Sequence, residues 1–211
     1  MLFRSLEGER AEAICRQLAH YDYLYLSGIS LAILSPASRD KLLTLLRQCR
    51  ANGGKVIFDN NYRPRLWASK EETRDVYNQM LGCTDIAFLT LDDEDALWGE
   101  KPVEEVIHRT QAAGVREVVV KRGADSCLVA IQGQPIVDVP AVKLPKENVV
   151  DTTAAGDTFC GYFLSGITKG REIPEILKTA SAASAIAVSR NGAAPSIPEY
   201  EEVEKFVAER G

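Results

Sequence analysis

The stretch Asp151-Thr152-Thr153-Ala154-Ala155-Gly156-Asp157-Thr158-Phe159 decides the fold, because it joins an apolar, strand-like approach to a helix. The approach is Asn148-Val149-Val150, and an apolar helix-forming segment runs from Thr158 onward. Between them, Ala154 to Gly156 carry almost no side chain, so a ligand can come close to the backbone. A helix that starts here has first-turn N–H groups without internal partners, and these groups with the helix dipole favour an anion such as phosphate.

Asp157 follows the last glycine of this turn and would place a carboxylate beside a bound phosphate. A carboxylate in that place can take a proton from an attacking hydroxyl group, which is the work of a general base. The alternative is that Asp151 and Asp157 only cap an ordinary amphipathic helix. The content of small residues does not by itself separate the two interpretations.

The nonapeptide Asp151–Phe159 closely resembles the signature of ribokinase-like (phosphofructokinase-B type) carbohydrate kinases. The resemblance implies that Asp157 is the catalytic base and contacts the substrate hydroxyl, and that an anion hole is formed by the N–H groups of Ala154, Ala155 and Gly156. The family usually has glycine in place of Ala154, so we expect a backbone there that suits a residue with a Cβ. Asp151 and Thr153 match positions that bind a monovalent cation, K⁺, in relatives, and capping is the alternative.

Strand-like and helix-like segments alternate along the chain, which predicts a mostly parallel sheet with helices on both faces. The expected strands are 23–27, closed by Gly28, then 55–59, 85–89 and 117–121; the expected helices are 9–20, 36–50, 70–81, 92–98, 103–113, 173–189 and 199–209. Segments 126–131 and 135–139 are expected to form an antiparallel hairpin at the sheet edge. The resemblance implies that residues 1–211 form a single α/β domain with the three-layer ribokinase-like fold.

Four polar clusters follow predicted strands: Asp59–Arg63, Thr90–Glu94, Lys121–Ser126 and the signature loop. In open α/β sheets, ligands bind beyond the carboxyl ends of the strands. Because all four clusters fall at that rim, a binding site explains them better than four independent surface loops.

The segment Phe58-Asp59-Asn60-Asn61-Tyr62-Arg63-Pro64-Arg65-Leu66-Trp67 is the second informative stretch. From the residues alone, its arginines either bind a carboxylate or phosphate, or merely pair with Asp59. The segment resembles the Phe-Asp-x-Asn-x-Arg-x-x-Leu-Trp pattern of 2-keto-3-deoxygluconate kinases, which implies that Arg63 contacts a sugar acid. A guanidinium fork suits the carboxylate that neutral hexoses lack.

The resemblance implies ATP-dependent phosphorylation of 2-keto-3-deoxygluconate to its 6-phosphate, with ATP and Mg²⁺ as cofactors. The alternatives are a kinase of another sugar, of the fructose or ribose type, and a non-catalytic fragment that binds nucleotide. Glu94 matches a glutamate that organises magnesium water, although the family's asparagine three residues earlier is Leu91 here. The positions that match nucleotide-binding elements are Asn61, Lys121, Arg122, Gly123, Ala124, Asp125, Ser126 and Ser181.

The composition excludes several other classes of protein. A net charge of -5 over 211 residues argues against nucleic-acid binding. The sequence contains no run of 18 apolar residues, so no membrane span is predicted. The segment Met1–Ser5 is followed by Glu7 and Glu9 and lacks the apolar core of a signal peptide. Five scattered cysteines fit a reducing cytoplasm, where we expect the protein.

The resemblance covers the later two-thirds of such a kinase. The family begins with a strand, a lid of extra strands and a Gly-Gly sugar-binding motif, and none of these precedes Glu7. We therefore expect the lid and the first strands to be missing. Beyond Cys160 the sequence, for example 185–196, looks more like other ribokinase-like members. The lid dimerises many relatives, so the sequence leaves undecided whether this chain forms a homo-oligomer.

Overall fold

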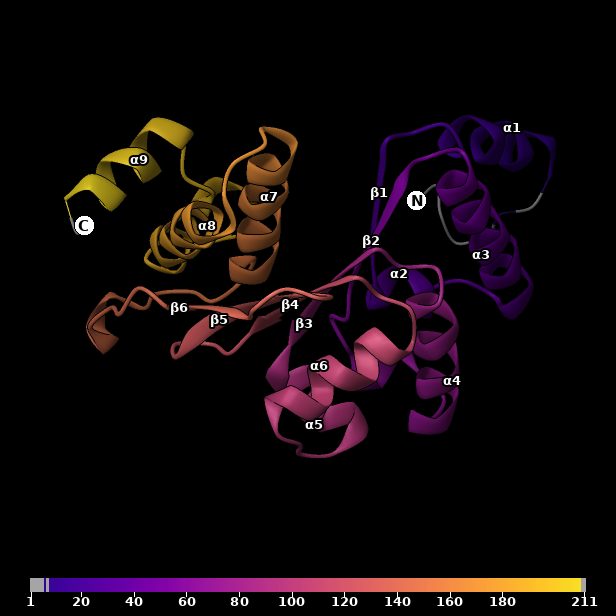
Figure 1. Cartoon of the computed structure of the whole chain (residues 1–211), viewed down its shortest axis with the longest axis horizontal. Coiled ribbons are helices and arrows are strands. Elements are labelled where there is room, and N and C mark those ends of the chain that lie inside the picture. The colour runs from indigo at the N-terminus through magenta and orange to yellow at the C-terminus, as the bar shows by residue number, and fades with distance from the viewer. Residues whose placement is uncertain (1–5, 7, 210–211) are drawn as a thin grey trace. The chain divides into compact units, whose positions relative to one another are not determined.

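The computed structural model describes Leu6 and residues 8–209; the expectations about Met1–Ser5 and Glu7 lie outside the described residues. The chain forms two compact units. Unit 1 comprises residues 1–121 and 130–135, and unit 2 comprises residues 122–129 and 136–211. Figure 1 shows the whole chain. The single domain expected over residues 1–211 stays a prediction.

Parallel strands form the core of unit 1. They are β1 (Tyr23–Ser27), β2 (Lys55–Asp59), β3 (Ile86–Thr90) and β4 (Glu117–Lys121), and each pairs in parallel with the next. Within unit 1 the strand order is β1-β2-β3-β4. Val118, Val119 and Val120 are fully buried, as expected for a strand that is covered on both faces. The predicted mostly parallel α/β sheet is confirmed.

Two helices of unit 1, α3 (Pro36–Ala51) and α4 (Lys70–Leu81), begin directly after a serine cap. The Ser35 hydroxyl accepts a hydrogen bond from the Ser38 N–H (3.3 Å) and Ser69 accepts from the Glu72 N–H (3.1 Å), so each satisfies one orphan donor. The helical elements are α1 (Glu9–Leu18), α2 (Gly28–Ala32), α3 (Pro36–Ala51), η1 (Pro64–Leu66), α4 (Lys70–Leu81), α5 (Leu91–Trp98) and α6 (Val103–Ala112). Figure 1 shows α1 beside α3, and α3 packs on β2.

Strand register brings the polar strand ends of unit 1 to one edge of the sheet. Ser27 pairs with Asp59 across β1 and β2, and Thr90 pairs with Lys121 across β3 and β4. The segments that follow β2 and β3 therefore leave the sheet side by side. Within this unit the predicted rim of polar residues is confirmed.

The strand β1 ends at Ser27 and Gly28 follows it directly, as the sequence suggested, but Gly28 is also the first residue of the short helix α2. A Cβ at Gly28 would lie 1.8 Å from the Tyr77 Oη atom and 2.2 Å from the Asn60 carbonyl oxygen. Only glycine fits this close approach. The helices α2 and η1 were not predicted, because neither is long enough to show a helical period.

Unit 2 contains the antiparallel pair of β5 (Ser126–Ile131) and β6 (Val137–Pro140), which confirms the predicted hairpin, with residues 130 and 131 of β5 assigned to unit 1. Figure 1 shows α7 (Ala155–Thr168) and α8 (Ile173–Val188) side by side. A Cβ at Gly166 would lie 2.6 Å from the Ile176 Cγ1 atom, so this glycine lets the helices pack closely. The remaining elements are η2 (Lys146–Asn148), η3 (Ala194–Ser196) and α9 (Tyr200–Ala208).

Within residues 6 and 8–209, no helix combines the length and the apolar character that a membrane crossing requires. All five cysteines are free thiols. The cytoplasmic location stays a prediction.

Candidate functional site

The signature turn in unit 2 opens directly into α7. The helix begins at Ala155 rather than at Thr158, and Ala154 is the residue before its first turn. Ala154 has φ 61° and ψ 9°, the left-handed region. The expectation that this backbone suits a residue with a Cβ is therefore wrong, because that conformation costs a non-glycine residue about 1–2 kcal/mol. The turn into α7 places residue 154 in the left-handed region, and Ala154 adopts that conformation at this energetic cost.

Two first-turn amides of α7 are free to bind an anion. The Thr158 N–H donates to the Ala154 carbonyl (2.8 Å) and so begins the helical ladder, while the Ala155 N–H donates weakly to the Thr152 carbonyl (3.3 Å). The N–H groups of Gly156 and Asp157 find no acceptor in the part of the chain that the structure describes. Unpaired donors at a helix start are the geometry of an anion site.

Asp157 lies in the first turn of α7 and its side chain is exposed. Within the described residues it makes no hydrogen bond and no ion pair, and it does not cap the helix, since Ala154 occupies the N-cap. A carboxylate beside free amides and open to solvent can meet a hydroxyl group. The geometry thus fits the role expected for Asp157 better than capping does.

Asp151 has a different environment. Its carboxylate accepts hydrogen bonds from the Thr153 N–H (2.8 Å) and from the Gly192 N–H (3.1 Å). Hydrogen bonds from Thr153, and then that from Gly192, hold the pKa of Asp151 below its usual value. Asp151 therefore ties the signature turn to the loop after α8 and does not cap α7. The monovalent-cation role of Asp151 and Thr153 stays a prediction.

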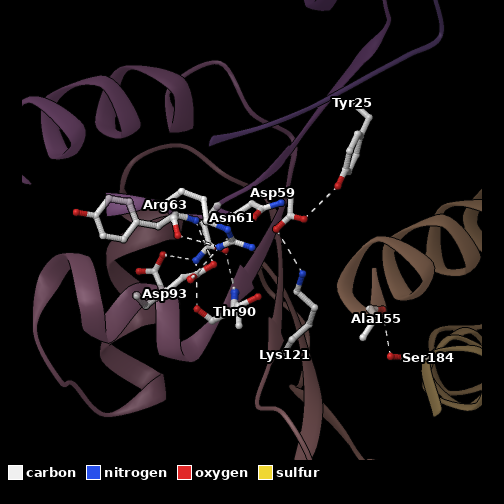
Figure 2. A network of polar contacts seen from close by, with 12 residues as sticks. Tyr25, Asp59, Asn61, Arg63, Thr90, Asp93, Lys121, Ala155 and Ser184 are labelled. Carbon is white, nitrogen blue, oxygen red and sulfur yellow. Dashed lines mark hydrogen bonds and ion pairs between the residues drawn. The ribbon is translucent and has the colours of Figure 1, made fainter. Parts of the chain in front are cut away.

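Helix α8 holds the signature turn through a serine that the sequence analysis did not single out. Ser181, the predicted nucleotide-binding residue, is buried within α8. Ser184, one turn later, donates a hydrogen bond from its hydroxyl to the Ala155 carbonyl (3.1 Å; Figure 2). The only sequence signal for Ser184 was its place among the small residues of this helix.

The predicted nucleotide-binding turn of unit 2, Arg122–Ser126, is held by its own side chains. Arg122 donates from Nε to the Ser126 hydroxyl (3.1 Å) and forms an ion pair with Asp138 (3.0 Å). The Asp125 N–H donates to the Arg122 carbonyl (3.1 Å), and Gly123 has φ 58°. The turn is therefore ordered, although Arg122 is already engaged within it.

In unit 1, Asn60 fastens the loop that follows β2, a role that sequence analysis missed. Its amide oxygen accepts from the N–H groups of Asn61 (2.8 Å) and Thr90 (3.1 Å), and its amide nitrogen donates to the Thr90 carbonyl (3.2 Å) and to Glu94 Oε1 (3.1 Å). These four bonds use its full capacity. Asn60 is 1% exposed. It links the ends of β2 and β3, so the next residues have a defined path.

Asn61, predicted to contact nucleotide, has φ 32°, a left-handed conformation that asparagine tolerates better than most residues. Its amide oxygen is buried and has no hydrogen-bond partner among the described residues. The nucleotide contact expected for Asn61 stays a prediction.

Asp59 does not pair with Arg63, the alternative that the sequence left open. Asp59 accepts a hydrogen bond from the Tyr25 hydroxyl (3.1 Å) and forms an ion pair with Lys121 (3.3 Å), as Figure 2 shows. Arg63 instead lies near Asp93, with Nη1 3.7 Å from Oδ1. Burial raises the pKa of Asp93, against the Tyr62 hydrogen bond and the charge of Arg63.

Glu94 is buried and both of its carboxylate oxygens are engaged. Oε1 accepts from Asn60, and Oε2 forms an ion pair with Arg109, whose guanidinium lies 4.4 Å from the centre of the Trp98 ring. Among residues 6 and 8–209, no group of three or more His, Cys, Asp or Glu side chains could hold a metal ion. The role of Glu94 toward magnesium water stays a prediction, and Arg109 is a partner that the sequence did not reveal.

The fold places this chain among the ribokinase-like α/β proteins. The structure described as a "putative Ribokinase II" from E. coli, in complex with ATP and Mg²⁺, matches it with a TM-score of 0.78 at 28% identity, over 92% of this chain and 61% of that one. Aminoimidazole riboside kinase from Salmonella enterica, complexed with aminoimidazole riboside and an ATP analog, matches with a TM-score of 0.78 at 26% identity, over 90% of this chain and 63% of that one.

The profile of the pfkB family carbohydrate kinases matches residues 4–200, so the chain belongs to that family. It is 76% identical to 2-dehydro-3-deoxygluconokinase of Escherichia coli (strain K12) over 166 residues, 78% of this chain and 54% of that protein. It is 63% identical to the Dickeya dadantii (strain 3937) protein of the same name over 188 residues, 89% of this chain and 61% of that protein. The chain thus spans little more than half the length of these relatives.

Proposed function

We propose that this chain carries the phosphoryl-transfer machinery of a sugar-acid kinase, and that its reaction is the ATP-dependent phosphorylation of 2-keto-3-deoxygluconate to the 6-phosphate. The observation that carries the proposal is the start of α7, where the exposed carboxylate of Asp157 adjoins the free N–H groups of Gly156 and Asp157. The identity of 63–76% with proteins named 2-dehydro-3-deoxygluconokinase supports the choice of substrate.

In this reaction Asp157 accepts the proton of the sugar's terminal hydroxyl as that oxygen attacks phosphorus. Phosphoryl transfer depends on position and charge neutralisation more than on covalent chemistry. The free amides of Gly156 and Asp157 hold the negative charge that develops on the transferring group, and a well-placed donor of this kind is worth about 3–4 kcal/mol. ATP, when bound, supplies the phosphoryl group; the residues proposed to hold it are Asn61, Lys121–Ser126 and Ser181.

Arg63 is proposed to bind the carboxylate of the sugar acid. Its side chain is 53% exposed, and only Nη1 is engaged among the described residues. The remaining edge of the guanidinium offers two parallel donors, the arrangement that binds a carboxylate at both oxygens. The carboxylate of Glu94 is engaged by Asn60 and Arg109, and that of Asp151 accepts from the Gly192 N–H, so neither is offered to Mg²⁺ or K⁺ in this arrangement.

The second candidate is a nucleotide-binding fragment without catalytic activity. Its support is that the chain spans 54% of the length of the E. coli relative. Phosphorylation of another sugar is the remaining alternative, and it is favoured if Arg63 does not contact substrate.

A coupled assay of ADP release with 2-keto-3-deoxygluconate, fructose and ribose distinguishes these possibilities. We expect release only with the sugar acid, and Asp157→Asn to lower kcat by about 10²–10⁴-fold, because the general base is lost. Glu201→Gln is the matched control, since Glu201 is an exposed acidic residue in the first turn of α9 and removing it changes the net charge equally. ADP release that is independent of sugar, or unaffected by Asp157→Asn, contradicts the proposal.

A further inference from the structure

Asp93 holds the loop that presents Arg63. It lies in the first turn of α5, which follows β3 directly, and its side chain is 20% exposed. Asp93 Oδ2 accepts a hydrogen bond from the Tyr62 N–H at 3.1 Å. Its other oxygen, Oδ1, lies 3.7 Å from Arg63 Nη1. One carboxylate therefore contacts both the backbone before Arg63 and the guanidinium itself (Figure 2).

The guanidinium of Arg63 is held at one corner only. Nη1 also donates to the Tyr62 carbonyl oxygen at 2.9 Å. Nε and Nη2 make no hydrogen bond or ion pair within the described part of the chain. Since Nε–H and one N–H of Nη2 point the same way, they form a complete bidentate edge for a carboxylate. The contacts at Nη1 decide the direction that this edge faces.

The backbone before Arg63 leaves little freedom for that direction to change. Asn60 is fastened by four side-chain hydrogen bonds, and Asn61 is fixed in a left-handed conformation by the bond between its N–H and the Asn60 amide oxygen. Asp93 holds the next residue, Tyr62, by accepting a hydrogen bond from its N–H. Residues Asn60 to Arg63 are thus held at successive positions by side chains from the loop itself and from α5.

We propose that Asp93 is a positioning residue that selects an acid substrate, by orienting Arg63 so that its Nε–Nη2 edge meets the substrate carboxylate. The inference rests on the proposed function and deepens it, because it assigns the preference for a sugar acid to an Arg–Asp pair. Asp93 does not touch the substrate; it acts through Arg63. Preorganising a charged donor avoids the cost of ordering a long side chain when the ligand binds.

The test is Asp93→Asn, with Asp92→Asn as its matched control. Asparagine has the same shape and keeps an oxygen for the Tyr62 N–H, but it turns an amide donor toward Arg63 in place of the carboxylate. Asp92 lies next to it in the same helical turn, is exposed and has no bonded partner among the described residues. Both variants remove one negative charge from the same helix start, so a long-range electrostatic effect is equal in the two.

We expect Asp93→Asn to raise KM for 2-keto-3-deoxygluconate roughly five- to tenfold, because a misoriented Arg63 loses part of its charge-assisted hydrogen bonding to the substrate carboxylate. Its kcat should change by less than about twofold, because the base Asp157 is untouched. Asp92→Asn should leave both constants within about twofold. In an Arg63→Met background, Asp93→Asn should have no further effect on KM, since it acts only through Arg63.

Calorimetric titration of the chain with 2-keto-3-deoxygluconate separates this inference from the proposed function. If the wild-type chain binds the acid but transfers no phosphoryl group, the proposed function fails, and the inference is judged by the ratio of Kd values for Asp93→Asn and wild type. An unchanged or lower Kd or KM in Asp93→Asn overturns it. An equal effect in the Arg63→Met background also overturns it, as does a wild-type chain that does not bind the acid.

Discussion

At the scale of single residues, Ala154 is where sequence and backbone disagree most. The turn before α7 requires a left-handed residue, and alanine carries a Cβ into that conformation. The next residue, Ala155, has entered the helix, where alanine is the favoured residue and glycine is not. Glycine is therefore favoured over alanine at position 154 and disfavoured at position 155.

We expect Ala154→Gly to increase the free energy of unfolding by about 0.5–1 kcal/mol, because the relief of left-handed strain exceeds the added entropy of the unfolded chain. The control is Ala155→Gly, which should lower it by about 1 kcal/mol. Urea denaturation followed by circular dichroism measures both. Destabilisation of similar size by the two substitutions would show that Ala154 is not strained.

At the scale of elements, the junction of β1 and α2 depends on one close approach. Gly28 faces the Tyr77 hydroxyl, which donates to the Asn60 carbonyl. Burial, followed by the charges of Asp93 and Glu94, raises the pKa of Tyr77 far above its ordinary value, so this hydroxyl stays a donor. The same Asn60 fastens the loop that carries Arg63. The close packing of Gly28 against Tyr77 therefore helps to hold Asn60, and with it the loop that carries Arg63.

Gly28→Ala is expected to destabilise the fold by about 2–3 kcal/mol, because the new methyl group overlaps the Tyr77 hydroxyl and forces the packing apart. Gly161→Ala is the matched control: it adds the same methyl group on the exposed face of α7, where no atom lies within 4 Å, and should stabilise by about 0.5–1 kcal/mol. Thermal unfolding compares the two. A Gly28→Ala protein as stable as wild type would mean that the Tyr77 side chain can move away from the new methyl group without loss of stability.

At the scale of the whole molecule, the loop that carries Arg63 and the signature turn belong to different units. The loop with Arg63 and Asp93 belongs to unit 1, and the signature turn with Asp157 belongs to unit 2. The chain as a whole matches 54–61% of its kinase relatives. Each unit can therefore be examined for its own ligand, whatever the activity of the complete chain.

We expect 2-keto-3-deoxygluconate to slow amide hydrogen exchange in residues 60–63, and ATP to slow it at residues 156–157. The reason is that a bound group protects the amides it contacts or orders. Exchange followed by mass spectrometry with each ligand alone measures this, and α9 serves as the internal control because no ligand is proposed there. ATP that leaves residues 156–157 unprotected contradicts the assignment of the anion hole.

Much of the fold could be predicted because its signals are local. The helices α3 and α4 follow the serine caps Ser35 and Ser69, and the buried strands are short apolar runs. The helices α2 and η1 escaped prediction because five and three residues show no period. Asn60 escaped because an asparagine after a strand usually indicates a loop, and its burial comes from contacts with β3 and α5.

The sequence by itself determined the alternation of strands and helices, the small-residue signature with Asp157, and membership of a kinase family, because each is written in consecutive residues. Only the tertiary structure decided which partner each charged group takes. Asp59 pairs with Lys121, 62 positions away, while Arg63 faces Asp93 and Glu94 joins Arg109. The physical reason is that strand register and helix packing bring these groups together, and a charge that leaves water must be paired wherever the fold places it.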